Sequence, residues 1–217
     1  NELKPIVKNI MNKLSDKPIK SMSFEYDPET GLKGIHNFIL ASGRSLSLRT
    51  TRTSMKIAPR VLGQAGYKVL NDYFYDVFGK MIETQEDIKE LMITHIAEIF
   101  PIIVDAFFAS DITVLIFLDE VDPEKQFLIF DNKELSNLNY SPEQFSFTRT
   151  LENWNESTTL KIDGISVAEI QIHKHRTFKF RFDVKNIAKW VNLVKITNET
   201  FGISAESAVC RKFNLVE

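Results

Sequence analysis

The stretch from Thr159 to Phe182, which reads TLKIDGISVAEIQIHKHRTFKFRF, constrains the fold more than any other part of the chain. Asp163 and Gly164 lie between two runs with strand-like apolar patterns. A type I′ turn needs φ > 0 at both of its central residues, which Asp tolerates and Gly adopts freely. The sequence therefore predicts a tight β-hairpin centred on these two residues.

Because side chains alternate between the two faces of a strand, each face of this stretch can be assigned. One face of the strand after the turn is expected to carry Ile165, Val167, Glu169, Gln171 and His173, and the other Ala168, Ile170 and Ile172. In the next run, Phe178, Phe180 and Phe182 alternate with Lys179 and Arg181. If the aromatic rings pack inward, the outward row can read a polar ligand or hold a metal. The alternative is an ordinary solvated sheet face.

Composition indicates a globular protein of the reducing, cytoplasmic type. The chain has 217 residues, 43% hydrophobic and 26% charged, with 17 Phe, so one Phe-rich core is expected. Cys210 is the single cysteine, which excludes a disulfide framework and a cysteine-based zinc site. No apolar run is long enough to span a membrane, and the first residues do not resemble a signal peptide. We expect a single domain over residues 1–217.

Charge is strongly segregated along the chain. No acid lies between Thr30 and Asp72, a window that contains Arg44, Arg49, Arg52 and Lys56 among its bases. A second basic cluster comprises Lys174, Arg176, Lys179 and Arg181, with His173 and His175 among them. Local field attracts a polyanion even when net charge is near zero. We expect adjacent strands of a shared sheet to gather both clusters into a groove for a polyanion, with nucleic acid as the favoured ligand; two solvated basic faces are the alternative.

Hydrophobic periodicity predicts an α/β (α+β) fold. Helices are expected over Leu3–Leu14, Tyr67–Met81, Val184–Leu193 and Ile203–Phe213, and over Glu83–Phe108 with a bend or break at Pro101. Strands are expected over Ser21–Tyr26, Ile35–Ala41, Ser45–Thr50, Ile112–Leu118, Gln126–Phe130 and Phe145–Arg149. The continuous apolar run at Ile112–Leu118 indicates a strand covered on both faces. Nucleotide-binding and common hydrolase motifs are absent from the sequence.

Two stretches resemble type II restriction endonucleases: GIHNFILASGRSLSLRTTRTSMKIAPRVLGQ and WNESTTLKIDGISVAEIQIHKHRTFKFRF. The resemblance implies the PD-(D/E)xK nuclease fold, a central mixed sheet flanked by helices that cleaves duplex DNA with Mg²⁺. In the first stretch the family's acid falls on His36 or Asn37, and its strand positions fall on Ser47 and Arg49. Arg replaces the family's Lys and no carboxylate remains there, which places catalysis at that site in question.

The second stretch supplies another candidate site. Glu169 and Gln171 resemble the Glu-x-Gln variant of the family, with Asp163 as a second acid. The C-terminal segment TNETFGISAESAVCRKFNL resembles the family's opening helix, in which a glutamate, here Glu206, helps to hold the metal. Residues 196–217 are then a permuted first helix, the start of a further module, or a plain surface helix.

The leading hypothesis is a type II restriction endonuclease that binds and cleaves duplex DNA at a short sequence. The resemblance implies catalytic roles for His36, Ser47, Arg49, Glu169, Gln171 and Glu206, with Mg²⁺ held by Glu206 and Glu169. Phosphate contacts are expected from Arg44, Arg49, Arg52 and Lys56, and base or backbone contacts from Gln171, His173, His175 and Arg176. A homodimer is expected from the symmetry of duplex sites. The alternatives are a non-catalytic DNA-recognition domain and an α/β domain that binds a small anion or a protein.

Overall fold

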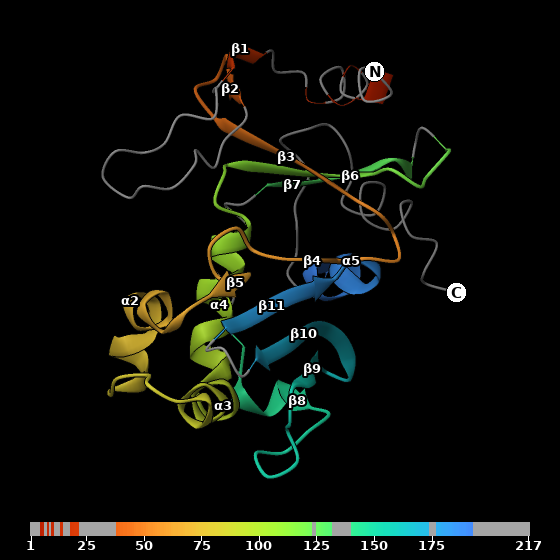
Figure 1. The fold of residues 1–217 in the computed structure, drawn as a ribbon. Helices are drawn as coiled ribbons and strands as arrows, with labels where there is room; N and C mark the ends of the chain where they lie inside the picture. Colours follow the sequence, from red (N-terminus) through yellow and green to blue (C-terminus); the bar gives the residue numbers. More distant parts are fainter. Residues whose placement is uncertain are drawn as a thin grey trace. The chain divides into compact units, whose positions relative to one another are not determined.

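The structure, a computed structural model, describes residues 5, 6, 8, 10, 14, 18–21, 38–122, 125–131, 140–173 and 177–192. It divides into two compact units. The first unit contains Asn1–Ser54, Phe108–Leu135 and Val194–Glu217, and the second contains Met55–Phe107 and Ser136–Leu193. Each unit has its own sheet (Figure 1).

The first unit is built on a five-stranded mixed sheet with the order β1-β2-β3-β6-β7. Its strands are β1 (Pro18–Ser21), β2 (Phe38–Leu40), β3 (Ser45–Thr51), β6 (Ile112–Phe117) and β7 (Phe127–Asp131). β3 and β6 run parallel, and the other neighbouring pairs are antiparallel. β2 and β3, which lie within two of the predicted strands, form a hairpin in which Gly43 adopts a φ of 85°. A side chain at this left-handed position would be strained, so the glycine is required by the turn.

The core of the first unit includes two strands, β6 and β7, that are buried on both faces. All six residues of β6 are buried, which confirms the prediction from its continuous apolar run. Ile10 and Leu14, from the N-terminal helical segment, pack in one cluster with Leu46, Val114 and Ile129. Ile10 and Leu14 of the predicted first helix therefore face the core.

The second unit is built on an antiparallel sheet with the order β4-β11-β10-β9-β8, and β5 also pairs with β11. Its strands are β4 (Lys56–Ile57), β5 (Gln64–Ala65), β8 (Phe145–Phe147), β9 (Ser157–Ile162), β10 (Ile165–His173) and β11 (Thr177–Asp183). A short 3-10 helix, η3 (Pro142–Gln144), precedes β8. Asp163 and Gly164 have φ values of 49° and 81° between β9 and β10. The predicted type I′ hairpin is confirmed.

Phenylalanine rings of β11 form the centre of the second unit's core. Phe178, Phe180 and Phe182 are fully buried, as the alternation predicts. The ring of Phe182 lies 4.9 Å from that of Phe107 in α4 (Ile96–Phe107) and 5.3 Å from that of Trp190 in α5 (Val184–Asn192). One face of the sheet is therefore covered by helices, and the residues that alternate with these phenylalanines lie on the other face.

The long helical region breaks at His95 and not at Pro101. α3 (Gln85–Thr94) ends at His95, whose φ of −120° is not helical, and α4 continues through Pro101. Proline in a helix interior costs about 3 kcal/mol. Six α4 residues are buried, Ile99, Phe100 and Ile103 among them, and each contributes roughly 1.5–3 kcal/mol, which outweighs that cost.

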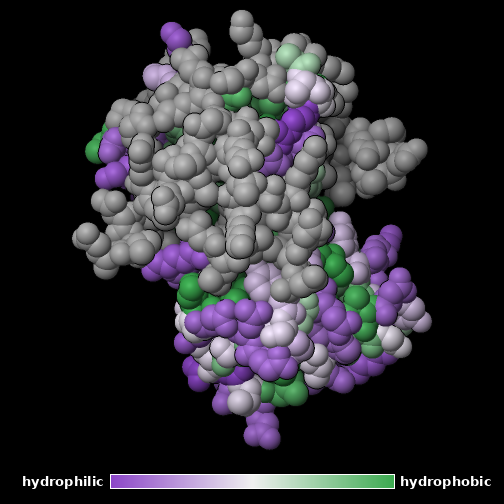
Figure 2. Space-filling model, turned by 180° about the vertical axis from the view of Figure 1, so that it is seen from behind, coloured by the Kyte–Doolittle hydropathy of each residue, from purple (hydrophilic) through white to green (hydrophobic). Residues whose placement is uncertain are grey.

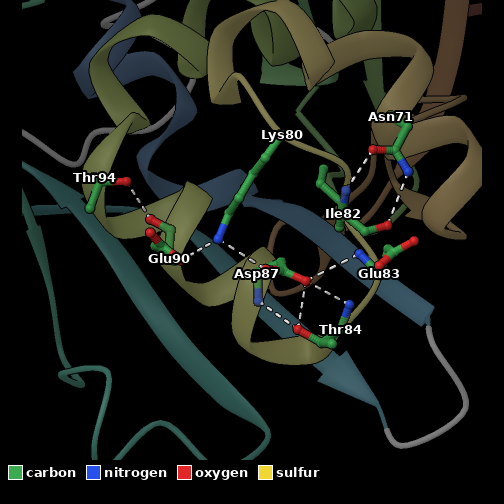
Figure 3. A network of polar contacts seen from close by, with 8 residues as sticks. All are labelled: Asn71, Lys80, Ile82, Glu83, Thr84, Asp87, Glu90 and Thr94. Atoms are coloured by element: carbon green, nitrogen blue, oxygen red, sulfur yellow. Dashed lines mark hydrogen bonds and ion pairs between the residues drawn. The ribbon is translucent and has the colours of Figure 1, made fainter.

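The corner between α2 (Tyr67–Phe78) and α3 is held by polar contacts (Figure 3). The Thr84 hydroxyl accepts the Asp87 backbone N–H at 3.1 Å, and the Asp87 carboxylate accepts the Thr84 N–H at 2.8 Å. This reciprocal capping box fixes the start of α3. Asn71 donates to the Ile82 carbonyl and accepts the Ile82 N–H, so it ties the loop back onto α2.

Two expectations about the architecture are corrected. The mixed α+β class is confirmed, but the strands form two sheets in place of one central sheet. Arg44 and Arg49 accompany β3 of one sheet, whereas Lys179 and Arg181 lie on β11 of the other. The expectation that one shared sheet gathers both basic clusters is therefore wrong for Arg44 and Arg49, whereas Lys56 on β4 does share a sheet with Lys179 and Arg181. The predicted helix Ile203–Phe213 lies outside the described residues.

Candidate nucleic-acid interface

A β-bulge in β10 sets which residues reach the polar side of the second unit's sheet. Ser166 pairs with Lys161 and Ala168 pairs with Leu160, so Val167 is an additional residue in β10. A bulge of this kind changes the phase of side-chain alternation along the strand that contains it. The alternation of inward and outward side chains before Val167 therefore does not predict which side chains face inward after it.

The bulge corrects the predicted faces at the start of β10. Ile165 lies opposite Ile162, which is fully buried, and side chains directly opposite each other share a face. Ile165 therefore belongs to the core side, and the prediction that it shares a face with Glu169 is wrong. Val167 is itself fully buried. From Glu169 to His173 the alternation holds, because Ile170 and Ile172 are buried between partly exposed polar residues.

Beyond the bulge, polar residues lie opposite one another across four strands. Arg181 pairs with Glu169 and Glu169 with Thr159, and Lys179 pairs with Gln171. We call the resulting surface the polar face: Lys56, Ser157, Thr159, Lys161, Ser166, Glu169, Gln171, His173, Thr177, Lys179, Arg181 and Asp183. Each of these residues is partly or fully exposed, and cations outnumber carboxylates among them. The polar face is thus an accessible, weakly positive surface.

The centre of the polar face is a cluster of one carboxylate and two cations. Glu169 Oε2 accepts from Lys56 Nζ at 2.9 Å and from Arg181 Nη2 at 2.8 Å. The Glu169 side chain is 19% exposed, against 42% for Lys56 and 36% for Arg181. Partial burial alone would raise the pKa of Glu169, but the hydrogen bond and charge of Lys56, with the charge of Arg181, lower the pKa below its usual value. Glu169 is therefore ionised at neutral pH.

Gln171 and His173 extend this cluster along β10. The Gln171 side chain also helps to lower the pKa of the Glu169 carboxyl group through a hydrogen bond. His173 Nε2 lies 3.3 Å from Gln171 Oε1, where a ring N–H can donate to the amide oxygen. The predicted readers of bases, Gln171 and His173, are thus adjacent to the cation cluster, and their orientations are coupled.

Arg44 is engaged in the interior of the first unit. Its Nη2 atom donates to Asp131 Oδ2 at 2.6 Å, and the two side chains are only 17% and 5% exposed. Beside it, the Asp111 carboxylate accepts the Ser45 N–H at 2.8 Å and the Ser45 hydroxyl at 2.7 Å. These contacts join the start of β3 to the start of β6 and the end of β7. We therefore assign Arg44 a structural role and leave it out of the proposed interface.

The other predicted residues of the first unit differ in exposure. Ser47 is buried and Arg49 is partly buried on β3, opposite Thr113 and Leu115, and both take part in further interactions within the molecule. Arg52 is exposed in the segment that follows β3. The Asp119 carboxylate accepts the Thr53 N–H and hydroxyl nearby. Of these residues Arg52 is the one whose side chain is open to a ligand.

Four predicted site residues lie outside the described residues: His36, His175, Arg176 and Glu206. Their proposed roles stay predictions. Asp163, the suggested second acid, is exposed in the β9–β10 turn, where its carboxylate accepts from Gln144 at 3.0 Å. The structure therefore brings together Lys56, Glu169, Gln171 and His173 from the predicted set.

Lys179 and Arg181 were placed in a basic cluster by the sequence but were not predicted as site residues. The signal that could have identified Arg181 is the alternation itself, which puts it on the same face of the hairpin as Glu169. The pairing of Lys56 with this cluster had no such signal, because β4 is short and joins β11 from a distant part of the chain.

The charge balance at Glu169 does not fit a magnesium ion. Within the described ranges, no group of three His, Cys, Asp or Glu side chains is arranged to hold a metal. Mg²⁺ is usually held by one or two carboxylates together with substrate phosphates and water. At Glu169 the single carboxylate is already shared by two cations, which would repel a divalent ion. The second predicted ligand, Glu206, is not among the described residues.

Comparison with known proteins gives one informative similarity. The chain is 28% identical over 157 residues to the type II restriction enzyme CviAII of Paramecium bursaria Chlorella virus 1. The matched region is 70% of this chain and 43% of that enzyme, so the chain spans less than half of its relative's length. No protein-family model matches the chain, and no solved structure matches it. The chain is thus a distant relative of a type II restriction enzyme.

The surface hydropathy and the helix lengths of the described residues bear on whether a large apolar region is present. Among the residues that Figure 2 colours, hydrophobic ones lie scattered between hydrophilic ones. None of the helices in the described part of the chain has the length and apolarity needed to cross a membrane.

Proposed function

We propose that this chain is the DNA-contacting part of a type II restriction endonuclease and binds duplex DNA through the polar face. The observation that carries the proposal is the cluster of Lys56, Arg181 and Glu169, with Gln171 and His173 beside it. The distant similarity to a type II restriction enzyme supports the same ligand.

Lysine and arginine supply the sequence-independent part of DNA affinity by neutralising phosphates. Lys56, Lys179 and Arg181 lie on two neighbouring strands of one face, so a backbone that follows these strands meets several cations in succession. Gln171 keeps one amide hydrogen and one oxygen lone pair beyond its contacts with Glu169 and His173, which is what a bidentate contact with adenine requires. The polar face thus offers both phosphate contacts and one group suited to base recognition.

The test is titration of a labelled mixed-sequence duplex with the purified chain, followed by fluorescence anisotropy at several salt concentrations in EDTA. We expect binding whose log K falls linearly with log salt, with a slope of roughly −0.9 for each phosphate neutralised. Lys68→Ala removes one exposed cation from α2 of the same unit, so it is the control for loss of a positive charge outside the polar face. Absence of salt-dependent binding at low salt would overturn the proposal.

Cleavage at a short specific sequence, with Mg²⁺ as cofactor, is the second part of the proposal. It is checked by adding Mg²⁺ to the same mixture and resolving the products on a gel. Discrete fragments that disappear on chelation support a nuclease.

A non-catalytic DNA-recognition domain is the alternative, and one observation favours it. Within the described residues, two cations neutralise Glu169, and the suggested second acid, Asp163, lies exposed in the β9–β10 turn, where it accepts from Gln144. This alternative predicts duplex binding that survives EDTA, with no fragments in Mg²⁺. The proposed homodimer is tested separately by light scattering of the free chain.

A further inference from the structure

The Lys56–Glu169–Arg181 cluster has the geometry of an anion site whose occupant is part of the protein. A single oxygen, Glu169 Oε2, accepts from both Lys56 Nζ and Arg181 Nη2 at 2.9 Å and 2.8 Å. A non-bridging phosphate oxygen is a charged acceptor of the same kind and forms charge-assisted bonds of the same length with these donors. The two cations are thus already spaced to share one anionic oxygen.

The exposure of the three side chains differs in a way that matters for an incoming ligand. The carboxylate is 19% exposed, whereas Lys56 and Arg181 are 42% and 36% exposed. An ammonium has three donors and a guanidinium has five, so neither cation is saturated by one carboxylate oxygen. The outward donors are therefore accessible to an incoming phosphate, which can then take the place of the carboxylate at the inward ones.

The contacts of Glu169 with the two cations have two opposite effects on DNA binding. They order the long side chains of Lys56 and Arg181, which would otherwise lose rotamer entropy when a phosphate binds. They also place a negative charge beside the phosphate, and like charges in contact cost affinity. Lys56 on β4 and Arg181 on β11 lie on neighbouring strands, and the Glu169 carboxylate on β10 is the acceptor that both side chains share.

We infer that Glu169 occupies the place of a DNA backbone phosphate in the free protein, as an internal counter-ion that positions Lys56 and Arg181 and is displaced from them by the duplex. This inference rests on the proposed function. It makes Glu169 a positioning residue, in place of the metal ligand that the family resemblance implied. The carboxylate sets the affinity for DNA in the absence of any divalent cation.

The variant that tests it is Glu169→Gln, which keeps the shape of the side chain and removes its charge. We expect the duplex affinity in EDTA to rise about tenfold, because the phosphate no longer competes with a carboxylate. The matched control is Glu156→Gln, which removes the same charge from an exposed residue immediately before β9 of the same sheet. A gain in Glu156→Gln of less than about threefold separates the local effect from a general change in charge.

A variant that also lacks both cations shows whether the gain in DNA affinity from Glu169→Gln depends on Lys56 and Arg181. In the background of Lys56→Ala and Arg181→Ala, Glu169→Gln is expected to change the affinity less than twofold. Urea unfolding and circular dichroism of each variant show whether it is folded. The conservative variant Glu169→Asp keeps the charge and is expected to bind like the wild type.

The possible failures are distinguishable. If the wild type binds DNA but Glu169→Gln binds equally or more weakly, the inference is overturned and the proposed function stands. If the gain appears only when Mg²⁺ is present, Glu169 acts through a metal, which also overturns the inference. If neither the wild type nor any variant binds with a salt dependence, both proposals are overturned.

Discussion

The two sheets of this protein use basic residues in opposite ways. In the first unit Arg44 is 17% exposed and is paired with Asp131, which is 5% exposed. In the second unit Arg181 and Lys56 are 36% and 42% exposed and share one partly buried carboxylate. The first arrangement pairs two largely buried charges beside the buried strands β6 and β7, and the second presents charges on a face that solvent can reach.

The contrast shows that a basic residue near a strand is not in itself evidence for a ligand site. Arg44 lies in a window of sequence without acids, yet its partner Asp131 comes from the end of β7. A charge that must be buried finds a partner from elsewhere in the chain. Charge segregation along the sequence therefore does not predict charge segregation in space.

The largest expected effect is on stability, in the first sheet. Asp131→Ala leaves the Arg44 guanidinium partly buried without its carboxylate, and we expect the free energy of unfolding in urea to fall by about 3 kcal/mol. The double variant Arg44→Met with Asp131→Leu removes both charges and is expected to recover much of that loss. A loss below about 1 kcal/mol would place this pair among ordinary surface ion pairs, and the two sheets would then not differ in how they use arginine.

In the second sheet, removal of a cation is expected to change binding more than stability. Arg181→Ala should lower duplex affinity about tenfold and reduce the salt slope by about one, measured by anisotropy. Its free energy of unfolding should change by about 1 kcal/mol or less, because Glu169 keeps Lys56 as a partner and the arginine is partly exposed. Destabilisation as large as that of Asp131→Ala would show that the two sheets use arginine alike.

The capping contacts of Thr84 and Asp87 supply a reference that includes no residue of the polar face. Thr84→Ala removes the cap of α3 and should cost about 1 kcal/mol in urea unfolding without changing DNA affinity. The Thr84 hydroxyl, the Glu83 N–H and Lys80 lower the pKa of Asp87 from 3.8 to about 2, against the opposing effect of burial. A lowered pKa contributes stability above pH 4 that is lost as the pH falls toward about 2.

Asp87→Asn isolates this titration. It should flatten the decline of unfolding free energy across that acidic range. An unchanged pH profile would contradict the assignment of the capping carboxylate.

The smallest effect is expected at Arg52, the exposed arginine of the first unit. Arg52→Ala should change stability by no more than about 0.5 kcal/mol, because the side chain is exposed. If it contacts a phosphate as predicted, duplex affinity falls a few-fold and the salt slope decreases by about one. Unchanged binding would confine the DNA contacts to the polar face and sharpen the difference between the units.

Local patterns in the sequence predicted most of the elements. The Asp163-Gly164 turn, the buried strand β6 and the alternation of Phe178, Phe180 and Phe182 each follow from a short stretch whose physics is local. The break at His95 was missed because Pro101 is the stronger local signal. Its cost is outweighed by burial that only the tertiary structure supplies.

The candidate site was predictable only along one strand. Glu169, Gln171 and His173 share a face because alternation places them there. The pairing of Glu169 with Lys56 depends on β4 joining β11, a contact between distant segments that no sequence period encodes. Partners such as Asp131 for Arg44 are hidden for the same reason, since ion pairs are set by the sheet order.

The additional residue in β10 has a consequence for how this hairpin can vary. With Val167 present, the side-chain alternation next to the Asp163-Gly164 turn does not set the alternation from Glu169 to His173. Changes in length near the turn can then be absorbed at the bulge, without rotating Glu169 toward the phenylalanine core. The bulge therefore allows the turn end of the hairpin to change in length during evolution while the direction of the Glu169 side chain is kept.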